Sequence, residues 1–144
     1  MTVAILDDYP VVIDVPIAWA DMDAYQHVNN TIYFRWFESA RIAFFERIGW
    51  YALKEQTGIG PILASTRCRF RIPLAYPDVV AVGARVSDVG ADRFLMEYAA
   101  VSRNLDKLAA EGDGVVVSYD YQALGKTDLP SEIRRRLAEL ESKP

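Results

Sequence analysis

The sequence between residues 31 and 48 reads TIYFRWFESARIAFFERI. Apolar residues recur in it at steps of three and four, which is the spacing of one face of an α-helix. This face consists of Tyr33, Trp36, Phe37, Ala40, Phe44 and Ile48. Asn29 or Asn30 can cap the start of the helix, and Gly49 can end it. Because further apolar residues widen this surface beyond one stripe, we expect other structure to wrap the helix on several sides.

Segments rich in β-branched and aromatic residues lie on both sides of this helix and predict strands. The expected strands cover residues 11–19, 62–72, 79–89, 93–103 and 114–124. Residues 50–61 are expected to be a connecting segment, and 104–113 a mobile loop or an extension of a hairpin. Residues 129–143 predict a short C-terminal helix with Ile133, Leu137 and Leu140 on one side.

The order of these elements predicts an α+β domain with a five-stranded antiparallel sheet wrapped around the long helix. The last four strands follow one another through short turns, which favours an antiparallel meander, and the first strand must join the same sheet. Pro16 favours an edge position for that first strand. We expect one domain over residues 1–144. The exposed edges and outer face of such a sheet favour a homo-oligomer.

Composition excludes several classes of site and partner. The chain has 144 residues, a net charge of −4, one His and one Cys, which is too few for a Cys-rich zinc site or an internal disulfide. We therefore expect no metal and no cofactor. The acidic balance argues against nucleic-acid binding, and no apolar run is long enough to span a membrane. The lone Cys and an N-terminus without a basic signal region predict the cytoplasm.

The densest chemistry lies in residues 21–30, DMDAYQHVNN, directly before the long helix. Unpaired N–H groups and the positive end of the helix dipole could stabilise an oxyanion there, and a partly desolvated carboxylate could act as base or nucleophile. These are the parts of an acyl-transfer site that needs neither metal nor Ser triad. Asp and Asn are also common in loops and as helix caps, so the residue types alone leave a purely structural interpretation open.

The stretch WADMDAYQHVNNTIYFRWFESAR, residues 19–41, resembles the signature of the hotdog-fold acyl-CoA thioesterases, most closely the 4-hydroxybenzoyl-CoA thioesterase-like group. The resemblance rests on Asp-x-Asp, His-Val-Asn-Asn, the following Tyr, and Glu-x-x-Arg on the helix. It implies a hotdog fold and hydrolysis of acyl-CoA or, less so, acyl-carrier-protein thioesters. It also implies a homodimer or homotetramer with the site at the subunit interface.

The resemblance assigns roles to individual residues. Asp23 matches the catalytic carboxylate, and the backbone N–H of Asn30 matches the oxyanion donor. His27 matches a His that joins the site in plant acyl-carrier-protein thioesterases, whereas Tyr25 stands where those proteins have Asn and Gln26 where many bacterial relatives have Gly. As substrate-binding residues we expect Tyr25, Asn29, Tyr33, Arg69 and Arg71.

The reaction route stays open at this stage. Asp23 could attack the thioester carbonyl and form a mixed anhydride, or it could activate a water molecule. His27 could orient Asp23 or a water, contact the substrate, or tie the loop to the helix cap. A hotdog hydratase or dehydratase and a non-catalytic acyl-CoA-binding protein are the alternative functions.

Four further features outside the loop also carry predictions. Arg67, Arg69 and Arg71 alternate along one strand and share a face, either as a phosphate-binding stripe or, as we favour, paired with carboxylates. Cys68 falls on the opposite, apolar face and predicts a small buried residue, not a nucleophile. Glu38, on the long helix, favours an intrahelical ion pair over a second catalytic carboxylate. The arginines at 134–136 predict a solvated helix face.

Overall fold

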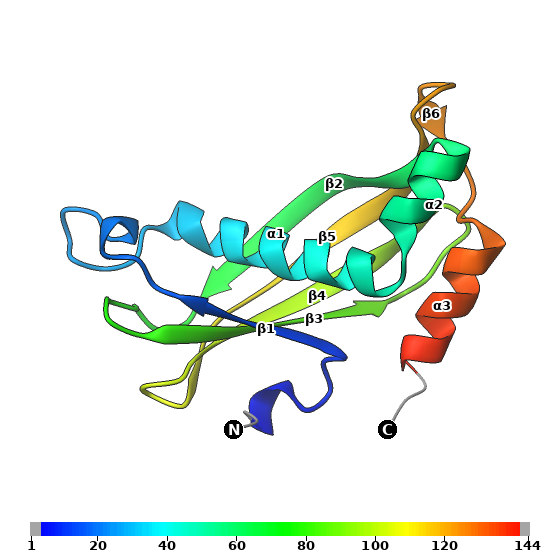
Figure 1. Ribbon diagram of the computed structural model, residues 1–144. Coiled ribbons are helices and arrows are strands. Elements are labelled where there is room, and N and C mark those ends of the chain that lie inside the picture. Colours follow the sequence, from blue (N-terminus) through cyan, green and yellow to red (C-terminus); the bar gives the residue numbers. More distant parts are fainter. Residues whose placement is uncertain (1–3, 142–144) are drawn as a thin grey trace.

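A computed structural model describes residues 4–141 of the chain (Figure 1). The helices are α1 (Asn30–Arg47), α2 (Trp50–Thr57) and α3 (Ser131–Glu141), with short 3-10 helices at Ala4–Leu6 and Trp19–Asp21. The strands are β1 (Val11–Pro16), β2 (Ile59–Phe70), β3 (Val79–Ser87), β4 (Arg93–Ser102), β5 (Lys107–Asp120) and β6 (Gly125–Lys126).

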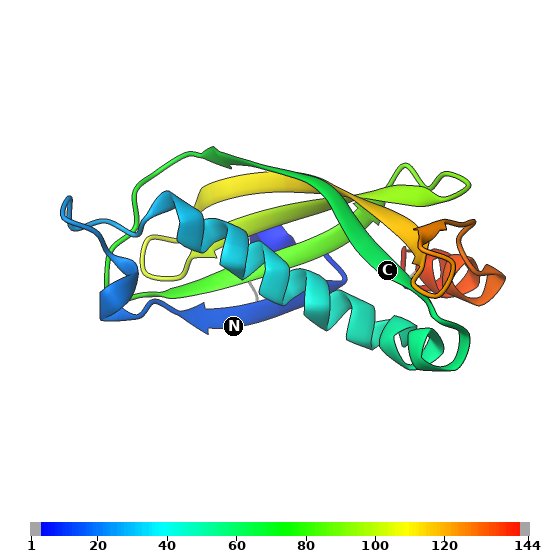
Figure 2. The same cartoon turned by 90° about the horizontal axis from the view of Figure 1, so that it is seen from above.

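The five long strands form one antiparallel sheet in the order β1-β3-β4-β5-β2, and β6 adds a two-residue pair to β5. The sheet curls around α1, which lies across its inner face (Figures 1 and 2). This confirms the predicted α+β architecture with a long central helix and a short C-terminal helix. β1 ends the sheet on one side with Pro16 as its last residue, in keeping with the predicted edge position.

Helix α1 forms where the periodicity predicts it. The Asn29 side chain caps its first turn by accepting a hydrogen bond from Thr31 N, and Gly49 ends it at a φ of 73°, a value that disfavours any residue with a Cβ. The apolar face is buried against the sheet, since Tyr33, Trp36, Phe37, Ala40 and Phe44 are all at most 2% exposed. Burial of this stripe holds α1 in place and so fixes the direction of its N-terminus.

The closest approach of α1 to the sheet depends on a glycine. The ring of Phe37 stacks on that of Tyr98 with 4.9 Å between centroids, and it lies directly over Gly112 of β5. A Cβ at Gly112 would come within 2.5 Å of the Phe37 ring and 2.4 Å of the Arg67 carbonyl oxygen. Only glycine therefore lets the helix and the neighbouring strand approach β5 at this point.

Two segments differ from the sequence prediction. Residues 50–61 are not a simple connection, because Trp50–Thr57 form α2 between two left-handed glycines and β2 begins at Ile59. Strand β5 starts at Lys107, seven residues before the predicted strand, and ends at Asp120, so residues 107–113 extend the hairpin, which is one of the two alternatives for 104–113, and are not a mobile loop. The Gly-Asp pair at 112–113 resembles a turn in the sequence, but it lies inside the strand because Gly112 makes room for Phe37.

The predicted meander of the last four strands is wrong for β2, the first of the four. β2 pairs with β5, in a register from Ile59–Asp120 to Phe70–Ala110, and not with β3. Only β3, β4 and β5 follow one another as neighbours. The segment between β2 and β3 runs from the β2 edge of the sheet towards the opposite edge. It passes next to the loop before α1, where Val28 N donates to the Leu74 carbonyl at 2.8 Å.

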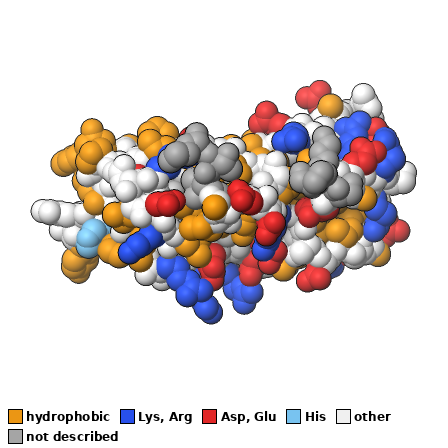
Figure 3. Space-filling view, turned by 90° about the horizontal axis from the view of Figure 1, so that it is seen from below, with side chains coloured by type: hydrophobic (Ala, Val, Ile, Leu, Met, Phe, Trp, Pro, Cys, Tyr) orange, Lys and Arg blue, Asp and Glu red, His pale blue; other side chains and the backbone are white. Residues whose placement is uncertain are grey.

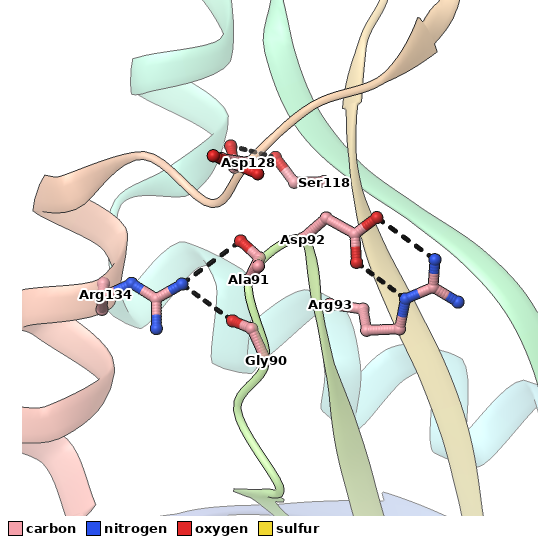
Figure 4. A network of polar contacts seen from close by, with 7 residues as sticks. All are labelled: Gly90, Ala91, Asp92, Arg93, Ser118, Asp128 and Arg134. Atoms are coloured by element: carbon pink, nitrogen blue, oxygen red, sulfur yellow. Dashed lines mark hydrogen bonds and ion pairs between the residues drawn. The ribbon is translucent and has the colours of Figure 1, made fainter.

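Helix α3 is fastened by arginines that we expected on a solvated face. Arg134 donates to the carbonyl oxygens of Gly90 (2.7 Å) and Ala91 (3.2 Å) in the turn between β3 and β4 (Figure 4). Arg136 donates to Ile48 O at the end of α1 (2.7 Å). The apolar side of the helix is buried as predicted, at Ile133, Leu137 and Leu140. Residues 142 and 143 of the predicted helix lie outside the described residues.

Candidate active site

The loop from Met22 to Val28 closes on itself immediately before α1. Met22 and Val28 form an antiparallel bridge, and Asp23 N donates to His27 O at 3.1 Å. Gln26 completes the turn at a φ of 62° and donates its N–H to Asp23 O at 2.9 Å. These bonds make a tight hairpin turn, so Asp23 sits at a position that the backbone fixes.

This loop is anchored to the structure around it. Asn29 N donates to Asp21 O (3.0 Å), and Val28 N donates to Leu74 O beyond the end of β2 (2.8 Å). The carboxylate of Asp21, the first of the two aspartates, accepts from Ala18 N at 2.8 Å and stabilises the 3-10 turn. Asp21 therefore has a structural partner, which leaves Asp23 as the aspartate that faces the site.

Both carboxylate oxygens of Asp23 accept hydrogen bonds from neutral donors. Tyr25 N donates to Oδ1 at 2.9 Å, and Asn29 Nδ2 donates to Oδ2 at 3.1 Å. The same Asn29 side chain accepts from Thr31 N (2.9 Å) and Thr31 Oγ1 (2.7 Å) through its Oδ1. Asn29 thus links the carboxylate to the first turn of α1, and each carboxylate oxygen keeps a further lone pair.

The first N–H of α1 is free. Among residues 4–141, Asn30 N donates to no acceptor, whereas the next N–H, that of Thr31, is capped by Asn29. A free N–H at a helix N-terminus carries partial positive charge from the helix dipole. It can donate to an oxyanion that forms beside Asp23.

A cavity of about 460 Å³ opens between this loop, the start of α1 and the end of β2. Its lining contains seven of the eight residues predicted from the sequence: Asp23, Tyr25, His27, Asn29, Asn30, Tyr33 and Arg71. It also contains four residues that the sequence did not single out: Val28, Phe70, Ile72 and Pro73. The last three lie just after Arg69 in the sequence, and only the position of the strand end beside the loop could have identified them.

Arg69 is the predicted site residue that the structure places elsewhere. It lines a separate cavity on the outer face of the sheet together with Arg85, Glu97 and Glu111. Its strand neighbour Arg67 forms a two-pronged ion pair with Asp113, at 2.9 and 2.6 Å. Arg71 is paired with Glu111 and reaches the rim of the Asp23 cavity. The arginine stripe therefore has carboxylate partners at both ends.

His27 is exposed, and its side chain makes no hydrogen bond to Asp23 within the described part of the chain. The contact that orients Asp23 comes from Asn29 instead, while the His27 carbonyl closes the loop turn. Glu38 lies outside the Asp23 cavity; its side chain is 60% exposed, and its ion pair with Arg41 is 3.9 Å long.

Two side chains near the site have raised pKa values. Burial raises the pKa of Tyr33, which lines the Asp23 cavity, to about 12, so its hydroxyl stays protonated at neutral pH. Burial also raises the pKa of Cys68 to about 11. Cys68 is half-buried on the inner face of the sheet, packed against the core. A thiol with this pKa is almost entirely protonated at neutral pH and is a poor nucleophile.

The described residues contain neither a cluster of metal-ligating side chains nor a helix suited to span a membrane. Between Ala4 and Glu141, no three side chains of His, Cys, Asp or Glu come together as metal ligands. None of the helices there is both long and apolar enough to cross a membrane.

Comparison with known families and structures gives one consistent result. The family model of the thioesterase-like superfamily matches residues 17–137. The chain is 30% identical to a thioesterase of Thermus thermophilus whose crystal structure holds coenzyme A and zinc; the match covers 96% of this chain and 98% of that one with a TM-score of 0.83.

Two further structures are similar. A protein of Pseudomonas aeruginosa strain PAO1 is 28% identical, with 96% of each chain covered and a TM-score of 0.81. A DHNA-CoA thioesterase of Staphylococcus aureus shares the fold at 18% identity, over 92% of this chain and 91% of that one, with a TM-score of 0.81.

Proposed function

The chain belongs to the thioesterase-like superfamily, and from that premise we propose that it hydrolyses acyl-CoA thioesters with Asp23 as the reacting carboxylate. The single observation that carries the proposal is the placement of this carboxylate. Asn29 ties it to the N-terminus of α1, where the Asn30 N–H has no acceptor among the described residues. A nucleophile or base and an oxyanion donor thus face one cavity.

The reaction consumes water and one thioester and releases a carboxylic acid and the CoA thiol. As a nucleophile, the Asp23 carboxylate attacks the carbonyl carbon, CoA leaves as thiolate, and water opens the mixed anhydride. As a general base, Asp23 takes a proton from the water that attacks the carbonyl. In both routes negative charge develops on the carbonyl oxygen, and the Asn30 N–H would stabilise it. The thiolate needs no strong general acid because thiol pKa values lie near about 8.5.

The cavity lining suggests how the other predicted residues take part. Asn29 is a positioning residue, since its amide holds the carboxylate. Tyr33 presents a protonated hydroxyl, and the exposed Tyr25 and His27 lie at the mouth and can contact the pantetheine arm. Arg71 lies at the rim, where its guanidinium can meet a phosphate of CoA. Arg69, on the outer face of β2, can contribute only to binding of the outlying nucleotide part of CoA.

We propose that the working unit is a homodimer, or a tetramer built from it, joined along β2. This strand is 12 residues long and lies at the end of the sheet, where its free edge can pair with a second chain. Its apolar residues are exposed, with Ile62 at 38%, Leu63 at 37% and Phe70 at 41%. Because Phe70 also lines the Asp23 cavity, a partner at this edge would complete the site at the subunit interface. The cytoplasm remains the predicted compartment.

A panel of acyl-CoAs tests the reaction class. Acetyl-, octanoyl- and benzoyl-CoA are incubated with the protein, and thiol release is followed beside Asp23→Asn. The matched control is Asp88→Asn, because Asp88 is exposed in the turn between β3 and β4 at a φ of 49°, which Asn tolerates. We expect thiol release by the protein and the control but not by Asp23→Asn.

Other outcomes identify the two alternatives. Tight binding of acyl-CoA without thiol release would replace hydrolysis by a binding function. Hydration of an enoyl-CoA without thiol release would place the chain with the hydratases.

A further inference from the structure

A second cavity lies on the other side of the Asp23 loop. It has about 450 Å³ and is lined by Trp19, Met22, Asp23, Gln26, Ala75 and Tyr76. Asp23 is the one residue that it shares with the cavity at the start of α1. Asp23 therefore borders both hollows, and a substrate whose reacting carbon lies at Asp23 can extend into both.

The two hollows differ in chemistry. The cavity at the start of α1 contains the Arg71 guanidinium, the Asn30 N–H and the His27 imidazole, beside the apolar residues Val28, Phe70, Ile72 and Pro73, so it is the one of the two that offers a cation to a ligand. The second cavity has no charged side chain apart from Asp23; Gln26 is its one amide residue, and its other walls are two aromatic rings, a thioether and a methyl group. An acyl-CoA has the same asymmetry, because its CoA arm carries amides and phosphates on one side of the carbonyl and the acyl group is apolar.

The aromatic walls of the second cavity are exposed. Trp19 is 72% exposed and Tyr76 is 49% exposed, although both lie beside a fixed loop. In the view from below, hydrophobic side chains gather at the end of the molecule that carries the histidine (Figure 3). Large apolar surface next to a reactive group is typical of a ligand site.

The backbone that carries these walls is held in position by two hydrogen bonds. Met22 N donates to Trp19 O at 3.3 Å, and Tyr76 N donates to Met22 Sδ at 3.5 Å. These contacts join the 3-10 turn that carries Trp19 to the segment that carries Tyr76. Because the backbone is fixed in advance, a ligand has to order only the side chains of Trp19 and Tyr76.

We propose that the acyl group of the substrate lies in this second cavity against Trp19 and Tyr76, while the CoA arm leaves through the cavity that contains Arg71. The inference rests on the proposed hydrolysis at Asp23 and adds the direction in which the substrate lies. It makes Trp19 and Tyr76 the residues that determine acyl-chain preference. Both lie outside α1, the helix that supplies most of the aromatic core.

Kinetics of two variants test the assignment. In Trp19→Ala and Tyr76→Ala, we expect kcat/KM for octanoyl-CoA to fall about 10-fold or more, and kcat/KM for acetyl-CoA to change less than about twofold. Leu124→Ala is the matched control, because Leu124 is also 72% exposed but lies in the turn between β5 and β6. An equal loss for both substrates would overturn the proposal.

A binding measurement keeps the test independent of turnover and of the variants' folding. Of the three tryptophans, Trp36 is 2% and Trp50 0% exposed, so quenching of fluorescence by acrylamide reports Trp19. In Asp23→Asn, saturating octanoyl-CoA is expected to protect Trp19 from the quencher, and free CoA is not.

Three results would contradict the proposal. Equal protection by free CoA would assign the cavity to the CoA arm, and no protection by octanoyl-CoA would leave it without an acyl group. Shielding of Trp19 in the ligand-free protein would show that a second copy of the chain covers the cavity. None of these results depends on thiol release, so they leave the proposed hydrolysis to be judged separately.

Discussion

Asp23 and Asp113 are both held by two hydrogen bonds, but the donors are of different kinds. Asp113, on the outer face of the sheet, accepts both bonds from the guanidinium of Arg67. Asp23 accepts one from a backbone N–H and one from an amide, both neutral. Charge-assisted pairs neutralise each other, whereas neutral donors orient a carboxylate and leave its charge uncompensated. On the outer face the carboxylate charge of Asp113 is neutralised by an arginine. In the loop the carboxylate charge of Asp23 stays available for a reaction.

The largest effect short of removing Asp23 is expected at the amide that orients it. Asn29→Ser keeps an oxygen that can cap α1 but removes the Nδ2 donor to Asp23. We expect kcat/KM to fall about 100-fold, because a small misplacement of a reacting group costs about that much. Stability should stay within about 0.5 kcal/mol of the wild type, since Ser is as good an N-cap as Asn.

Asn29→Ala is the companion variant, measured by the same kinetics and by urea unfolding. It loses the cap as well as the donor, so its stability should fall by about 1 kcal/mol more. If Asn29→Ser kept full activity, Asn29 would be only a helix cap.

A smaller effect is expected in the free energy of unfolding at high pH, and it comes from Tyr33 in the wall of the cavity. The pKa of Tyr33 is raised from 10.0 to about 12 in the folded chain, so between these values the unfolded chain loses its proton first. The free energy of unfolding therefore falls as pH rises through that window. Below the window, Tyr33 causes no change in it. The loss is on the order of 2 kcal/mol.

Denaturant unfolding of wild type and Tyr33→Phe at about pH 9 and about pH 11.5, on either side of the ordinary tyrosine pKa, measures this contribution. The variant should lose less stability over the interval than the wild type. Equal losses would mean that the Tyr33 hydroxyl is not buried in the folded protein.

The smallest effect is expected on the outer face. Arg67→Gln breaks the pair with Asp113, but the Arg67 side chain is 79% exposed and its ion pair is screened by water and salt. We expect kcat/KM within about twofold and Tm within about 2 °C of the wild type. A loss of activity comparable to that of Asn29→Ser would show that the outer face takes part in catalysis and would break the comparison.

Local patterns in the sequence predict some of these features and miss others for physical reasons. The spacing of Tyr33, Trp36 and Phe37 predicts α1 because periodicity along one helix is a local property. The pairing of β2 with β5 was missed because it joins segments that are far apart in the chain. The sequence of neither segment indicates which strand it pairs with. The sequence leaves residues 104–113 open between a mobile loop and an extension of the hairpin, because Gly112 resembles a turn residue until Phe37 is placed above it.

The candidate site shows the same division. Asp23, His27 and Asn30 can be found from the sequence because they lie within one short stretch before a helix. Asn29 can bond to both Asp23 and Thr31 only because the loop folds back on itself. Phe70 lines the cavity only because β2 ends there. Alternation does place Arg67 and Arg69 on one face, but only the register with β5 shows that this face meets Asp113 and Glu111.

The most direct test of the account is the ratio of kcat/KM for thiol release between wild type and Asp23→Asn, on the acyl-CoA that the wild type hydrolyses fastest. Removal of a reacting carboxylate predicts a loss of about 10³-fold or more, with Tm unchanged and with Asp88→Asn at wild-type activity. An Asp23→Asn protein that is folded and retains about a tenth or more of the wild-type kcat/KM would contradict the assignment of Asp23 as the reacting carboxylate.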